Sequence, residues 1–175
     1  MTRRSNEVKT LKELELILQN IIPKQIISDG RVEKVLQETM QKAVQEVVYD
    51  AYVPKSYKRR GSLGGLGDPR LMQITEAMMQ GNTFVILFEN LAKGNDTLEG
   101  KYLSETIENG IKENWSRQGE WSNPRPFVKE VTTRITNNPQ PLIEAVKSAF
   151  VKVGFRVRWF DWVRLKKLDT LLKIN

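Results

Sequence analysis

The chain has 175 residues and a formal net charge of +7, and it contains neither cysteine nor histidine. This length suits one domain with a hydrophobic core. The missing cysteines exclude disulfides, thiolate chemistry and cysteine-ligated metal. The missing histidines remove the commonest general base and the commonest zinc ligand, which argues against an enzyme. Because no apolar run is long enough to cross a membrane and none follows Met1, we expect neither a membrane span nor a secretory signal.

Two helices are predicted in the first part of the chain. The first covers residues 6–22, and Pro23 is expected to end it. Its apolar residues recur at helical spacing: Leu11, Leu14, Leu18 and Ile21. The second and longer helix starts at the N-cap residues Ser28 and Asp29 and runs to about Tyr49. It carries an apolar stripe that predicts a core face, made of Val32, Val35, Leu36, Thr39, Ala43, Val44 and Val47.

Residues 49–69, which read YDAYVPKSYKRRGSLGGLGDP, form an irregular segment that we call the contact loop. It holds three tyrosines, four cations and four glycines, with almost nothing to fill a core. Tyrosine and arginine commonly anchor protein interfaces, and glycine allows the backbone to turn where a Cβ would clash. The composition therefore predicts contact with a partner or a neighbouring subunit.

A β-hairpin and further helices are predicted after the contact loop. Residues 71–79 and 83–89 read as two strands joined by a Gly-Asn turn, and the apolar character of the second suggests cover on both faces. Helices are expected over residues 102–115, from Pro126 to about residue 137, and over 142–153. Residues 155–160 alternate like a short strand, and residues 161–173 resemble a basic terminal helix.

The predicted fold is a single α+β domain. A long helix packs on a small antiparallel sheet, with additional helices and the extended contact loop. Residues 1–27 form an N-terminal helical extension, and residues 155–175 form a basic C-terminal extension. The charge is unevenly distributed, since an acidic middle of the chain is flanked by basic regions. Such a distribution suits head-to-tail packing of identical subunits.

One acidic pattern could indicate a metal-dependent nuclease. Asp96, Glu99 and Lys101 form a D-x-x-E-x-K string, in which two carboxylates could hold Mg²⁺ while the lysine orients a water. In such enzymes the E-x-K part belongs on a strand. Here it falls in a glycine-flanked loop beyond the hairpin, so this interpretation is the least favoured. The glycine-rich residues 61–67 lack the strand–loop–helix context and the G-K-[ST] ending of a phosphate-binding loop.

Basic residues near aromatic residues could contact DNA. The contact loop contributes Lys58, Arg59 and Arg60, and the C-terminal extension contributes Arg156, Arg158, Arg164, Lys166 and Lys167. Contacts of this kind reach the phosphate backbone and carry no sequence information. Since no helix-turn-helix or zinc module accompanies them, we expect at most a non-specific contact with DNA.

Two patches resemble a family of small phage virion proteins. YDAYVPKSYKRR at residues 49–60, followed by GLGD at 65–68, resembles a signature of small virion proteins in phages of Gram-positive hosts. Arg-Pro-Phe at residues 125–127, followed by helix to about residue 155, is similar to the tail-completion or head–tail joining proteins of long-tailed phages. The resemblance implies a ring at the neck or the head-proximal end of the tail, with no catalysis. The interaction residues assigned in this way are Tyr49, Tyr52, Tyr57, Lys58, Arg59, Arg60, Leu66, Asp68, Arg125 and Phe127.

Trp121 adds a candidate aromatic anchor, because it lies between Gly119 and Pro124 in an irregular segment. We therefore expect a non-enzymatic structural protein of the virion, made in the host cytoplasm. Its expected partners are copies of itself and neighbouring connector or tail proteins, without cofactor, metal or membrane. A non-specific nucleic-acid-binding accessory protein is the first alternative, and the nuclease is the second.

Overall fold

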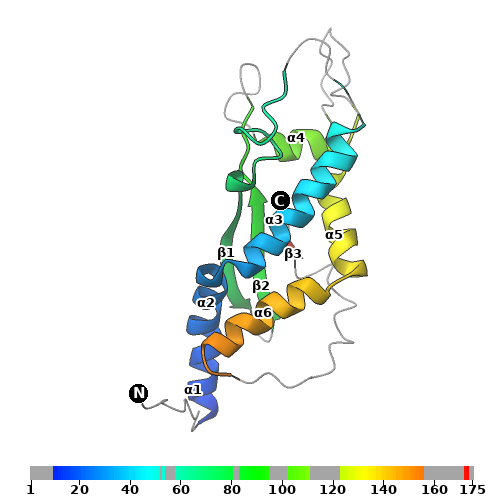
Figure 1. The fold of residues 1–175 in the computed structure, drawn as a ribbon. Coiled ribbons are helices and arrows are strands. Elements are labelled where there is room, and N and C mark those ends of the chain that lie inside the picture. The colour runs from blue at the N-terminus through cyan, green and yellow to red at the C-terminus, as the bar shows by residue number, and fades with distance from the viewer. Residues whose placement is uncertain are drawn as a thin grey trace.

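The structure is a computed structural model of the chain, and it describes residues 10–51, 53, 58–80, 83–94, 102–110, 123–155 and 172–173. These residues form an α+β fold in which helices surround a small sheet (Figure 1). The predicted fold class is therefore confirmed. One hydrophobic core joins the long central helix, the sheet and the helices of the second half of the chain.

The N-terminal helical segment does not end at Pro23. It comprises α1 (Leu11–Leu16), a π-helical turn (Ile17–Ile21) and α2 (Ile22–Asp29), which follow one another without a break. A capping box between Thr10 and Glu13 starts it. Pro23 lies in the first turn of α2, where a missing N–H is tolerated, and the π-helical turn directly before it adjusts the hydrogen-bond ladder. The predicted stop at Pro23 is wrong for this reason.

The central helix begins one or two residues later than predicted. It consists of α3 (Arg31–Ala43) and a π-helical extension (Val44–Tyr49). Its N-cap residue is Gly30, in the left-handed conformation at φ 69°, which also ends α2. Asp29 is not the cap, because its buried carboxylate pairs with Lys152 of a later helix and lies 3.9 Å from Arg31.

The predicted core stripe of this helix is confirmed. The fully buried side chains on it are Val32, Leu36, Met40, Ala43, Val44 and Val48, and Val35 and Val47 pack partly against the same core. Two polar residues of α3 also face the first strand. Glu33 accepts a hydrogen bond from the Ile74 amide at 3.1 Å, and Gln37 donates to the Met72 carbonyl at 2.8 Å. These contacts satisfy main-chain groups of an edge strand that would otherwise be open to pairing.

The sheet contains the predicted hairpin and one further strand. A 3-10 turn (Pro69–Leu71) leads into β1 (Met72–Gln80), which pairs antiparallel with β2 (Thr83–Asn90) and carries a register shift between Ile74 and Glu76. The short strand β3 (Leu172–Lys173) pairs parallel with β2, giving the order β1-β2-β3. The predicted terminal helix is thus wrong at its last two residues, where main-chain pairing with the edge of β2 prevails over helix formation.

Only one face of β2 is fully buried. Ile86, Phe88 and Asn90 alternate as buried residues, whereas the residues between them are partly exposed. The prediction from its continuous apolar sequence, that β2 is covered on both faces, is therefore wrong for the second face.

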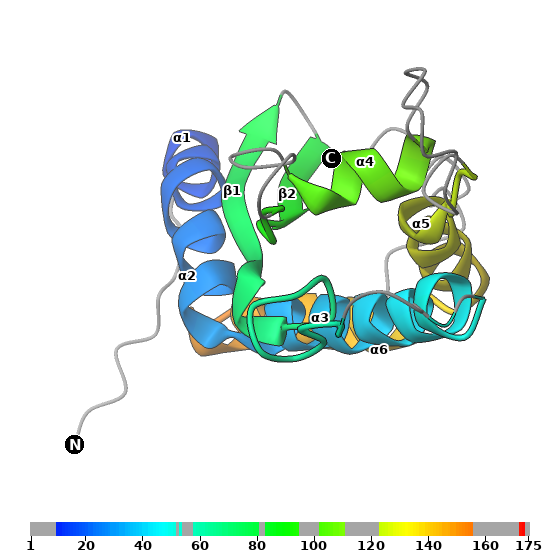
Figure 2. The ribbon, with the colours of Figure 1, turned by 90° about the horizontal axis from the view of Figure 1, so that it is seen from above.

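The remaining helices follow the predicted order. They are α4 (Leu103–Asn109), α5 (Phe127–Asn137) and α6 (Gln140–Lys152). Helix α4 is shorter than predicted because Gly110, at φ 71°, follows its last residue. Figure 2 shows α2 beside β1, α5 on the opposite side of the molecule, and α3 and α6 close together. Arg134 of α5 pairs with Glu46 of the central helix and, at 2.8 Å, with Glu130.

Candidate protein interface

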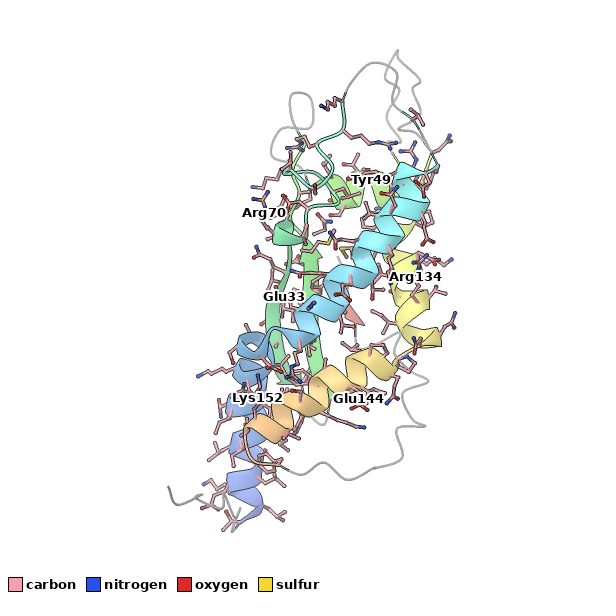
Figure 3. The ribbon with its side chains drawn as sticks, in the orientation of Figure 1. Glu33, Tyr49, Arg70, Arg134, Glu144 and Lys152 are labelled. Carbon is pink, nitrogen blue, oxygen red and sulfur yellow. The ribbon has the colours of Figure 1, made fainter. Side chains whose placement is uncertain are left out.

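The described part of the contact loop lies at one end of the molecule. Residues 58–68 contact the central helix at Tyr49 and residues 91–94 at Lys93, and they lie at the same end of the molecule as α4 and the start of α5 (Figures 1 and 3). Main-chain hydrogen bonds at this end run from the Leu103 amide to the Ala92 carbonyl and from the Arg125 amide to the Ile107 carbonyl, both at 2.8 Å. The fold therefore places the two segments that the sequence singled out, 49–69 and 125–127, at the same end of the molecule.

Tyr49 fastens the contact loop to the central helix. Its hydroxyl accepts a hydrogen bond from the Gly67 amide at 2.9 Å, and the Arg59 guanidinium lies over its ring at 4.9 Å. Arg59 also donates to the Tyr49 carbonyl at 2.8 Å. Burial raises the pKa of the Tyr49 hydroxyl, which therefore stays protonated. Both side chains are engaged within their own chain, so their described contacts are structural.

Asp68 closes the loop from its other end. The carboxylate is buried, with 1% of the side chain exposed, and it accepts hydrogen bonds from the amides of Gly64 and Arg70 at 2.8 and 3.0 Å. The Arg70 guanidinium binds the same carboxylate at 2.7 Å. These contacts, led by the Arg70 side chain, hold the pKa of Asp68 well below its ordinary value. A Cβ on Gly65 would lie 2.7 Å from the Gly61 carbonyl oxygen, so a glycine is required for this closure.

Leu66 and Asn90 fix the loop to the sheet. Leu66 is 3% exposed and belongs to the core, which overturns the expectation that the loop has almost nothing to fill one. Its carbonyl accepts a 2.7 Å hydrogen bond from the Asn90 side-chain amide, and the Ala92 amide donates to Asn90 Oδ1 at 3.1 Å. Asn90 was not predicted as a functional residue. The sequence gives little indication of its role, because it is one polar residue at the end of an apolar strand.

The exposed part of this end is a small mixed surface, which we call the loop patch: Arg60, Leu63, Lys93 and Tyr102. Leu63 is 78% exposed and Tyr102 is 45% exposed. Arg60 donates to the Lys93 carbonyl, the Lys93 ammonium lies 5.6 Å from the centre of the Tyr102 ring, and the Leu63 amide donates to the Arg60 carbonyl. Only Arg60 was predicted from the sequence. Exposed apolar groups beside cations can bind a protein surface that offers apolar groups beside carboxylates.

The Arg-Pro-Phe segment has a structural role in the described contacts. Phe127 is fully buried in the core, so its assignment as an interaction residue is wrong. Glu108 of α4 accepts hydrogen bonds from the amides of Val128 and Lys129, at 2.8 and 3.2 Å. It thus satisfies two unpaired donors in the first turn of α5. Arg125 and Lys58 remain partly or fully exposed at the same end of the molecule.

Other predicted site residues fall outside the part of the chain that the structure describes: Tyr52, Tyr57, Trp121, the acidic string Asp96, Glu99 and Lys101, and the basic residues Arg156, Arg158, Arg164, Lys166 and Lys167. Within the described ranges, no group of three or more aspartates and glutamates is arranged to hold a metal ion. In the same ranges, no helix is both long and apolar enough to cross a membrane.

The chain is a small α+β protein with an exposed patch of apolar and cationic side chains at one end. A family model described as YomN matches residues 10–152, and because this is most of the chain, the chain belongs to the YomN family. The family supports the broader class that the sequence resemblance indicated, a phage-associated protein, without specifying a place in the particle. No curated protein and no solved structure matches the chain significantly.

Proposed function

We propose that this protein is a structural component of the phage particle. In this proposal it forms a ring at the neck or at the head-proximal end of the tail and joins neighbouring connector or tail proteins. It is made in the host cytoplasm and ends up in the virion. The observation that carries the proposal is the loop patch, in which the exposed Leu63 and Tyr102 lie with the cations Arg60 and Lys93 next to a loop that is fastened at several points.

The fastening of the loop supports a binding role. The contacts of Tyr49, Asp68 and Asn90 hold the loop backbone before any partner arrives. The part of the loop that these contacts hold, residues 58–68, loses less conformational entropy on binding, so more of the contact energy contributes to affinity. An exposed leucine side chain has an unfavourable free energy of hydration in the free protein, and burial against a partner removes it from water.

Mass measurement in solution tests this proposal. Light scattering over a concentration series, in low and moderate salt, should find a closed oligomer, or a monomer that assembles when particle components are added. Leu63→Asp should weaken assembly by at least about tenfold, which is typical for a central interface anchor. The matched control is Ser62→Asp, which places the same charge on the neighbouring exposed residue and should weaken assembly much less.

A different result would favour a different function. A persistent monomer whose mass changes only when DNA is added would contradict the ring and favour the non-specific nucleic-acid-binding alternative. In that case the affinity for DNA should fall steeply as salt is raised.

A further inference from the structure

We infer that the loop patch of one copy binds the N-terminal helix of the next copy, at a surface that we call the helix stripe: Leu11, Leu14 and Glu15. The inference rests on the proposed function, because it assigns the surfaces through which identical subunits meet in the assembly. It makes the second copy of this chain the partner of an apolar surface that the described residues of one copy leave uncovered.

The helix stripe is the overhanging end of a longer apolar row. Leu11, Leu14 and Leu18 recur at helical spacing along α1 and the π-helical turn that follows. Leu18 packs partly against the core, whereas Leu11 is 87% exposed. In Figure 1, α1 extends from α2 beyond the lower ends of the strands. The apolar row that packs on the core at Leu18 therefore continues to Leu11, beyond the ends of the strands, where nothing in the described residues covers it.

Helix α1 is formed without burying any of its own side chains. Short helical segments are marginal in water, and most helices in proteins gain their stability from packing of an apolar face. Here the Thr10–Glu13 capping box and the continuation into α2 hold the segment in place. Contact of Leu11 and Leu14 with a second copy would supply the missing packing.

The two surfaces are complementary in chemistry. The loop patch offers exposed apolar groups from Leu63 and Tyr102 beside the cations Arg60 and Lys93. The helix stripe offers exposed leucine beside a carboxylate, Glu15, on the same side of the helix at i and i+4. Apolar contact would supply most of the affinity, and the charges would select the partner and its orientation.

The two surfaces lie at opposite ends of the molecule, as Figure 1 shows for α1 and for residues 58–68. One copy therefore cannot bring its own loop patch onto its own helix stripe. A contact between two different surfaces of identical subunits is a head-to-tail contact, which generates a ring when the rotation between copies closes. This geometry is the one that a ring at the neck requires.

Two blocked variants test the contact. Leu63→Asp removes the loop patch and Leu11→Asp removes the helix stripe, and each variant alone should be monomeric at concentrations where the unmodified chain assembles. An equimolar mixture should form heterodimers and nothing larger, because one intact loop patch and one intact helix stripe remain. Light scattering measures the mass, and thermal unfolding checks that both variants are folded. If an aspartate unfolds the chain, the milder Leu63→Ser and Leu11→Ser pair tests the same contact.

A charge exchange tests the orientation. Glu15→Lys should weaken assembly by about two- to fivefold, the range of an exposed ion pair, and adding Lys93→Glu in the same chain should restore it. Lys12→Glu is the control on the same helix and should not weaken assembly.

The possible results separate the two proposals. A Leu11→Asp variant that assembles like the unmodified chain, or a mixture that stays monomeric, would overturn the inference and leave the ring intact. A Leu63→Asp variant that assembles like the unmodified chain would overturn the inference and also the role of the loop patch in the proposed function. An unmodified chain that remains monomeric, alone and with particle components, would overturn both.

Discussion

The side-chain amide of Asn90 should be among the most important polar groups for stability, because it joins the contact loop to the sheet. The residue is 2% exposed, and its amide contacts two main-chain groups, the Leu66 carbonyl at 2.7 Å and the Ala92 amide at 3.1 Å. Asn90→Ala leaves both without a partner. Each buried polar group left unsatisfied costs about 1–3 kcal/mol, so the loss of both partners should lower the free energy of unfolding by about 2–6 kcal/mol.

Urea unfolding followed by circular dichroism measures this change. With a slope of about 2 kcal/mol per molar urea, the midpoint should fall by roughly 1–3 M. Amide hydrogen exchange should show the loss most strongly at residues 64–68, which the Asn90 contact holds. Asn90→Asp keeps the acceptor for Ala92 but sets a carboxylate oxygen against the Leu66 carbonyl. It should therefore destabilise the fold near neutral pH and do so less in acid, where the protonated carboxyl can donate again.

Asn123→Ala is the matched control, because Asn123 is exposed at the same end of the molecule. It should change the free energy of unfolding by less than about 0.5 kcal/mol. An Asn90→Ala variant as stable as this control, with unchanged exchange in the loop, would refute the reasoning that Asn90 fastens the loop.

Three further variants test other parts of the fold. Glu108→Ala should lower the free energy of unfolding by about 0.5–2 kcal/mol, because it removes the side chain that caps α5. Glu105 is exposed on the same helix as Glu108, so Glu105→Ala should have little effect in the same urea assay. The folded-state pKa of Asp68 is depressed from an ordinary value of 3.8, so its stabilising contribution is complete above that pH and is lost as pH falls toward the folded-state pKa. Urea midpoints measured from about pH 5 to pH 2 should therefore fall less steeply in Asp68→Asn than in the unmodified chain, and equal slopes would contradict the Asp68–Arg70 contact. Gly30→Ala should lower the free energy of unfolding by about 1–2 kcal/mol, because Gly30 has a left-handed backbone, and Gly30→Asn should lower it less. Nothing lies within 4 Å of a Cβ added at this position, so the effect tests backbone strain and not a clash. Equal stability of the unmodified chain and both variants in thermal or urea unfolding would refute the strain argument.

Periodicity in the sequence predicted the elements whose packing depends on local pattern. The apolar stripe of the central helix, the hairpin around its Gly-Asn turn and the start of α5 after Pro126 all follow from spacing and turn chemistry alone. The helix that continues through Pro23 did not follow, because a π-helical turn compensates for the proline. The short strand β3 also could not be predicted from local sequence pattern, because it depends on pairing with a distant segment of the chain.

The sequence singled out the contact loop as a candidate interface, but it did not show which side chains of the loop are exposed. Aromatic and cationic composition pointed to the contact loop, but composition cannot tell which of its side chains face inward. Tyr49 and Asp68 are drawn into the fold by hydrogen bonds to the loop's own backbone, and Leu66 is drawn in by the core. Leu63 lies in a turn and Tyr102 is the N-cap residue of α4, and their neighbours are known only once the fold brings residues 60–63, 93 and 102 together.

Electron microscopy of particles tests the proposed place in the virion most directly. In a phage that encodes this chain, a stop codon early in its gene would remove the protein, and a plasmid copy would restore it. The proposal predicts heads and tails that accumulate separately without the protein and join when the unmodified chain is supplied, whereas the Leu63→Asp variant should fail to restore joining. Complete, infectious particles formed in the absence of the protein would contradict it.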